Sequence, residues 1–82
     1  MVEESELRKI LHGAVPGAVR VDVVDTTGTG DHFEAVIVAS GFEGKSRVER
    51  HRIVYAALGD LMKREVHALA LKTLTPEEDS KP

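Results

Sequence analysis

The chain has 82 residues, of which 30% are charged and 41% hydrophobic; it contains no cysteine, and its formal net charge is −3. This length predicts a single domain, and the lack of cysteine excludes disulfides, zinc–thiolate sites and a thiolate nucleophile. Because there is neither an apolar run of about 18 residues nor a signal peptide, we expect a cytoplasmic protein without a membrane partner, and its acidity disfavours nucleic-acid binding by bulk attraction.

The first predicted element is a helix in the opening stretch of the chain. Leu7, Ile10, Leu11 and Ala14 recur at spacings of three and four residues, which is typical of an amphipathic helix. Acidic residues precede this stripe, where the positive end of the helix dipole favours them. The Pro16-Gly17 pair predicts that the helix ends before it.

Two strands joined by a polar loop follow this helix. The first strand has alternating valines, which predict one buried face formed by Val19, Val21 and Val23. Residues 25–31 are too rich in glycine, threonine and aspartate for the interior of an element. The second strand begins near His32, and its predicted buried face consists of Phe33, Ala35, Ile37 and Ala39.

A second helical region is predicted from about residue 46 to residue 64. Ser46 is followed three residues later by Glu49, the pattern of a capping box. Gly59 leaves open whether this region is one helix or two shorter ones. The buried stripe is expected to comprise Val54, Ala57, Leu58 and Leu61.

The last predicted strand covers residues 66–74, where alternating residues again indicate two faces. We assign residues 1–76 to one domain and residues 77–82 to a flexible tail that starts with, at most, a helical turn. The order is α-β-β-α(α)-β, and the helical crossover allows the third strand to run parallel to the second. This predicts an α+β fold with a three-stranded mixed sheet and helices on one face, the element order of a class II KH-like fold.

Two glycine motifs suggest functions that their surroundings do not support. Gly44-Lys45-Ser46 resembles the end of a phosphate-binding P-loop, but Ala39 occupies the position of the first glycine. The GxxG pattern at 41–44 resembles the clamp of KH domains, yet here it falls between a strand and a helix. We therefore interpret both as turns, and we expect no enzymatic activity.

A cluster of basic side chains lies at the start of the second helical region. It consists of Lys45, Arg47, Arg50 and Arg52. Such a run usually forms a solvated helix face, and the functional alternative is a docking surface for an acidic partner or for nucleic acid.

The four histidines are His12, His32, His51 and His67. They are the main soft donors of a chain that lacks cysteine. Each, taken alone, is more often structural than a metal ligand. His32 follows the glycine-rich loop, and His67 opens the third strand.

Three segments resemble one known family. Residues 41–58 read GFEGKSRVERHRIVYAAL, residues 66–78 read VHALALKTLTPEE, and the loop with its flanks reads DTTGTGDHF. Together they resemble the BolA family over nearly the whole chain. The resemblance implies the class II KH-like fold and a heterodimer with a monothiol glutaredoxin, acting in iron–sulfur cluster trafficking or in iron or redox regulation.

The resemblance also implies a ligand set. His67 is the cluster-ligand candidate of the last strand, and the second ligand comes from the loop between the first two strands, where His32 is the nearest donor. Two imidazoles can replace two thiolates on one iron of a [2Fe–2S] cluster. The sulfur ligands would then come from the partner's cysteine and a glutathione-type thiol, so that the isolated chain, a monomer or weak dimer, binds no cluster tightly.

Two alternatives stay open. The family resemblance also suggests a DNA-binding transcriptional regulator, for which the basic helical region 46–64 would provide the contacts. In the third interpretation the chain is an adaptor, which docks the glutaredoxin in its cluster-free form and gates its cluster.

Overall fold

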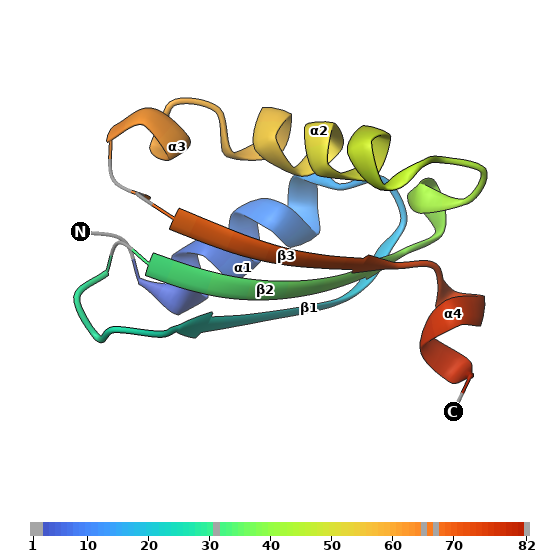
Figure 1. The fold of residues 1–82 in the computed structure, drawn as a ribbon, viewed down its shortest axis with the longest axis horizontal. Coiled ribbons are helices and arrows are strands. Elements are labelled where there is room, and N and C mark those ends of the chain that lie inside the picture. The colour runs from blue at the N-terminus through green and yellow to red at the C-terminus, as the bar shows by residue number, and fades with distance from the viewer. Residues whose placement is uncertain (1–2, 31, 65, 67, 82) are drawn as a thin grey trace.

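The computed structural model describes residues 3–30, 32–64, 66 and 68–81. Three strands form one sheet in the order β1-β2-β3, in which β1 is antiparallel and β3 parallel to β2 (Figure 1). The elements are α1 (Glu4–Ala14), β1 (Ala18–Asp25), β2 (His32–Ala39), the 3₁₀ turn η1 (Ser40–Phe42), α2 (Arg47–Leu58), α3 (Leu61–Arg64), β3 (Ala68–Leu74) and α4 (Pro76–Ser80). The predicted α+β fold with a mixed sheet is confirmed.

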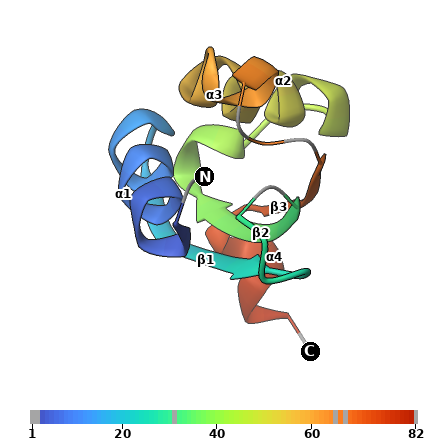
Figure 2. The same ribbon diagram turned by 90° about the vertical axis from the view of Figure 1, so that its left-hand side faces the viewer.

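The hydrophobic core lies between the sheet and helices α1 and α2. These two helices lie on one side of the sheet, and the short α4 lies on the other side at one end (Figure 2). The predicted inner face of β2 is confirmed, since its members are at most 2% exposed: Phe33, Ala35, Ile37 and Ala39. Val38 belongs to the opposite face, yet it is buried because α4 packs against β2 and β3.

One expectation about β1 is wrong. Val21 and Val23 are buried as predicted, but Val19 is 62% exposed. The register explains the difference: Ala18 pairs with Ala39 and Arg20 pairs with Val38, so Val19 is skipped. A β-bulge of this kind interrupts the alternation on which the prediction relied.

The helical region 46–64 is two helices, and local signals explain both ends of the first. The capping box is present, because Ser46 Oγ accepts from the Glu49 N–H and Glu49 Oε1 accepts from the Ser46 N–H. Gly59 adopts a φ of 54°, which only glycine adopts readily, and this ends α2. Val54 and Leu58 are buried, and Ala57 and Leu61 pack against the core as predicted.

The segment after β3 forms α4. Thr75 caps this helix in a second capping box with Glu78. Glu78 Oε1 also accepts from Arg50 Nη1 at 2.8 Å, and Arg20 Nη1 lies 3.1 Å from Asp79 Oδ2. Residues that the sequence analysis assigned to a tail thus contact both α2 and β1.

Among the described residues, no helix is both long enough and apolar enough to cross a membrane.

The Arg50–Glu78 pair predicts a pH dependence of stability. The hydrogen bond from Arg50, followed by that from the Thr75 backbone, lowers the pKa of Glu78 from 4.5 to about 2. Since the folded-state pKa lies below the unfolded one, ionised Glu78 stabilises the fold above pH 4.5, and this contribution is lost as the pH falls toward about 2. The melting temperatures of the wild type and Glu78→Gln should therefore converge over this range. Glu77→Gln is the control for the loss of one negative charge. If the melting temperatures of Glu78→Gln and the wild type differed by the same amount at every pH, this would contradict the assignment of the stabilisation to ionised Glu78.

Gly41 is required by close packing. A Cβ at this position would lie 2.3 Å from the carbonyl oxygen of Pro16, and the Gly41 N–H donates to the same oxygen. We expect Gly41→Ala to lower the free energy of unfolding by about 1–3 kcal/mol through overpacking. Gly13→Ala is the matched control: nothing lies within 4 Å of that Cβ, so a gain of about 0.5–1 kcal/mol is expected in helix α1. Urea unfolding measures both, and a Gly41→Ala variant as stable as the wild type would refute this packing argument.

Candidate functional site

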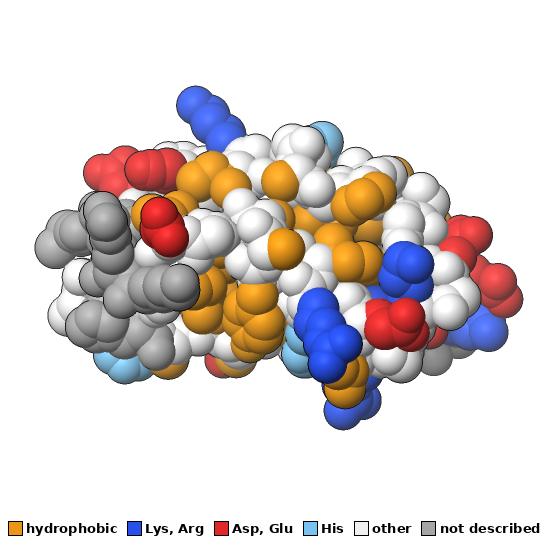
Figure 3. Space-filling model, turned by 90° about the horizontal axis from the view of Figure 1, so that it is seen from above, with side chains coloured by type: hydrophobic (Ala, Val, Ile, Leu, Met, Phe, Trp, Pro, Cys, Tyr) orange, Lys and Arg blue, Asp and Glu red, His pale blue; other side chains and the backbone are white. Residues whose placement is uncertain are grey.

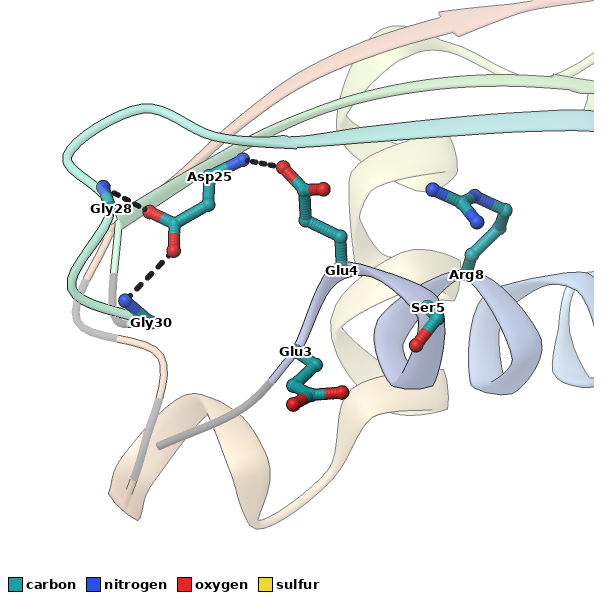
Figure 4. A pocket seen from close by; sticks show the side chains of 7 residues that line it. All are labelled: Glu3, Glu4, Ser5, Arg8, Asp25, Gly28 and Gly30. Atoms are coloured by element: carbon teal, nitrogen blue, oxygen red, sulfur yellow. Dashed lines mark hydrogen bonds between the residues drawn. The ribbon is translucent and has the colours of Figure 1, made fainter.

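The loop between β1 and β2 is organised by one carboxylate. Asp25 Oδ1 accepts from the Gly28 N–H and Asp25 Oδ2 accepts from the Gly30 N–H, each at 2.9 Å (Figure 4). Both glycines have positive φ angles, 74° and 79°, which glycine adopts without strain. An aspartate that bonds to N–H groups a few residues ahead stabilises a turn. The loop therefore has a defined shape.

Helix α1 supports this loop from one side. Glu4 Oε2 accepts from the Asp25 N–H at 2.5 Å, which joins the first turn of α1 to the end of β1. The two segments border an open pocket of about 600 Å³, into which the charged side chains of Glu3 and Arg8 also extend (Figure 4). The loop is thus held both by its own aspartate and by the helix.

His32 follows this loop, and its backbone is held firmly. The Thr26 N–H and the Thr26 hydroxyl both donate to the His32 carbonyl oxygen, at 3.0 and 3.2 Å. The side chain of His32 is half-buried. His32 begins β2 and is the register partner of Ala68, the first residue of β3.

The second predicted ligand, His67, lies outside the described residues. It immediately precedes Ala68 in the sequence, and Ala68 is paired with His32. The structure therefore shows the start of β2 beside the start of β3, at the sheet end that also carries the β1–β2 loop (Figure 1). Over residues 3–30, 32–64, 66 and 68–81, no group of three or more His, Cys, Asp or Glu is arranged to hold a metal ion.

The four predicted basic residues do not form one uniform surface. Lys45, Arg47 and Arg52 are exposed, whereas the side chain of Arg50 is only 13% exposed. Arg50 donates to the carbonyl oxygens of Lys45 and Thr73, at 3.0 and 3.2 Å, and its guanidinium lies 5.9 Å from the ring centre of Phe42. Arg50 thus connects α2 with β3 and α4. The DNA-binding alternative would use Arg50 to contact DNA, although this side chain already makes contacts within the fold.

The other two histidines have surroundings that agree with structural interpretations. His12 is exposed in the last turn of α1. His51 is half-buried on α2 and packs edge-on against Tyr55, with ring centres 6.4 Å apart.

Sequence reasoning missed the roles of Asp25 and Arg50. The spacing from Asp25 to Gly28 is a detectable signal, because aspartate followed by glycine is typical of side-chain-stabilised turns. No local signal was available for Arg50, since its partners Thr73 and Glu78 are 23 and 28 residues away in sequence.

The carboxylate of Asp25 should determine the order of the loop. Asp25→Ala removes the acceptor of the Gly28 and Gly30 amides, so hydrogen exchange at these amides should accelerate by about tenfold or more, the loss expected for hydrogen bonds to a charged group. Asp22→Ala is the matched control, because Asp22 is an exposed residue of the same strand paired with Arg20. Unchanged exchange at both glycines in Asp25→Ala would show that the loop is held by other contacts.

Comparisons with known proteins agree in family and fold. The model of the BolA-like protein family matches residues 5–78. Protein BOLA2 of Arabidopsis thaliana is 43% identical over 65 residues, which are 78% of this chain and 69% of that protein. BolA-like protein 2 of Saccharomyces cerevisiae is 37% identical over 81 residues, 98% of this chain and 67% of the yeast protein.

Other relatives are longer, and solved structures share the whole fold. The match to BolA-like protein 1 of Bos taurus, 45% identical over 51 residues, spans only 38% of that protein. The structure of a BolA protein homologue from Coxiella burnetii aligns with a TM-score of 0.79 at 38% identity, covering 99% of this chain and all of that one. With the family match over most of its length, the chain belongs to the BolA-like protein family.

Proposed function

We propose that this protein binds a monothiol glutaredoxin and shares a [2Fe–2S] cluster with it through His67 and His32, in iron–sulfur cluster trafficking or in iron or redox regulation. The observation that carries the proposal is the pairing of His32 with Ala68, the neighbour of His67 in sequence. Membership of the BolA-like family supports the partnership, because the resemblance that implies it extends over nearly the whole chain.

The donors of the chain fit one half of such a site. The sequence offers imidazoles and no thiolate, and two imidazoles are the ligands that one iron of a Rieske-type cluster accepts. The remaining ligands are thiolates, which this chain lacks and which a glutaredoxin cysteine and a glutathione-type thiol would provide. The bound cluster would supply the transferable iron and sulfide, or the redox-active centre, of the complex.

The residues around His32 would preorganise this half-site. Thr26 fixes the position of the His32 backbone through two hydrogen bonds. Asp25 and Glu4 fix the loop that precedes it. A ligand presented from an ordered backbone loses less conformational entropy when it binds than one on a mobile loop. The backbone that carries His32 would therefore need no large rearrangement when the partner binds.

The test is a mixing experiment followed by visible circular dichroism. The wild-type chain, added to a cluster-loaded monothiol glutaredoxin, should change the spectrum, because imidazole replaces another ligand of the cluster. His67→Ala and His32→Ala should each abolish or strongly reduce this change, and His12→Ala, at the far end of α1, should preserve it. Far-UV spectra of the variants establish that they are folded.

The three possible failures have separate meanings. A spectral change that survives His67→Ala removes His67 as a ligand. A spectral change that is lost in His67→Ala but survives in His32→Ala removes His32 as the ligand from the loop and leaves the proposed partnership standing. No change with the wild-type chain, under conditions where pull-down shows the two proteins bound, would replace cluster sharing with the adaptor interpretation.

A further inference from the structure

Strand β3 has an open edge beside helix α2. Within the part of the chain that the structure describes, it is the last strand of the sheet and pairs only with β2. The Thr73 carbonyl accepts from Arg50 of α2, which shows that the backbone groups of Thr73 point away from β2. Because successive residues of a strand alternate in direction, those of Leu71 point the same way.

This edge has few partners within the protein. Among the described residues, the Arg50 guanidinium is the only group that hydrogen-bonds to the outward backbone groups of Leu71 and Thr73. A hollow of about 450 Å³ lies beside them, lined by Arg47 and His51 of α2 and by residues 71–74 of β3. An unpaired edge is a ready template for another strand, and natural proteins usually block it. Here the flanking helix leaves space next to it.

The groove between α2 and β3 is positively charged, although the chain is acidic overall. Lys45 and Arg47 lie on its α2 side and Lys72 on β3. In the described part of the chain, none of these three side chains has an ion pair or a hydrogen bond. Figure 3 shows Lys and Arg side chains beside hydrophobic and acidic ones at the end of the molecule where α2 begins.

A carboxylate already occupies one end of this groove. Glu78 Oε1 lies 2.8 Å from Arg50 Nη1, and these residues line a second hollow of about 480 Å³ together with Lys45, Arg47, Thr73 and Leu74. An acidic side chain therefore fits against the cations of the groove. This charge complementarity is the reason to expect an acidic ligand.

We propose that the groove binds an extended acidic segment of a partner protein, which adds to β3 as a fourth strand. Its backbone would pair with the outward groups of Leu71 and Thr73, as in other complexes formed by strand addition. Side chains of a strand alternate between its two faces, so acidic residues on one face would meet Arg47 and those on the other would meet Lys72. The groove lies at the opposite end of the sheet from His32, so this binding is separate from cluster sharing (Figure 1).

A peptide fits this edge better than a single-stranded nucleic acid does. The edge offers both N–H donors and C=O acceptors, and a phosphodiester backbone has acceptors only. The aromatic side chain next to His51 is Tyr55, whereas nucleic-acid grooves usually present several rings for stacking. The net charge of −3 also opposes a polyanion more than a short peptide.

The test uses fluorescence anisotropy with the full chain and a labelled peptide in which pairs of glutamates alternate with pairs of valines, so that both faces of the strand carry glutamates. The peptide has about eight residues, within the usual length of a strand. We expect Arg47→Glu and Lys72→Glu each to weaken binding by about tenfold or more, the size expected for reversing a charge at a contact. Arg52→Glu, an equal charge change at an exposed position of α2, should leave binding within about twofold. The same peptide with alternate amides N-methylated should not bind, and His32→Ala should bind normally.

Other outcomes overturn the proposal in distinct ways. Equal weakening by Arg52→Glu and Arg47→Glu would mean non-specific attraction. Undiminished binding of the N-methylated peptide would exclude strand addition. Binding of oligothymidylate that Arg47→Glu removes, without binding of the peptide, would make the groove a nucleic-acid site. Self-association that blocks the peptide would show that a second copy is the occupant.

Discussion

The parallel pairing of β2 and β3 is the constraint on which the rest of the structure depends. Strands that run the same way need a long connection, and α2 and α3 provide it while covering the core. The same pairing sets the start of β3 beside the start of β2, where His32 faces Ala68. It also leaves β3 at the edge of the sheet, next to the groove that α2 forms.

The two ends of the sheet are stabilised by different chemistry. At the end with the β1–β2 loop, the Asp25 carboxylate satisfies backbone N–H groups, which gives an ordered loop before a potential ligand. At the other end, the Arg50 guanidinium joins α2, β3 and α4 through carbonyl oxygens and the Glu78 carboxylate. A chain of this size buries a modest core, so such charged contacts at its margins contribute to the definition of the fold.

The sequence predicted those parts of the fold that short-range patterns encode. The Ser46–Glu49 capping box and the break at Gly59 are both written within a few consecutive residues, and the structure has both. Alternation placed the inner face of β2 correctly for the same reason. It failed at Val19, because a bulge depends on the pairing of two strands and leaves no trace in one of them.

The candidate site was predictable in part. His32 could be singled out because it follows a glycine-rich loop, and its pairing with Ala68 follows from a topology that the sequence indicated. The roles of Asp25 and Arg50 could not be assigned in this way. Arg50 looked like a surface cation, since its partners at positions 73 and 78 become neighbours only after β3 has joined the sheet. Charge alone therefore does not separate a docking residue from a structural one.

Because the chain contains no cysteine, a cluster that it shares with a partner would take nitrogen ligands from this chain and sulfur ligands from others. Pulsed electron paramagnetic resonance of the reduced cluster complex, with this chain alone labelled with ¹⁵N-histidine, tests this set of ligands most directly. Imidazole of this chain bound directly to the cluster should give ¹⁵N hyperfine couplings, which diminish in His67→Ala. A cluster complex of both proteins without such couplings would contradict nitrogen ligation by this chain.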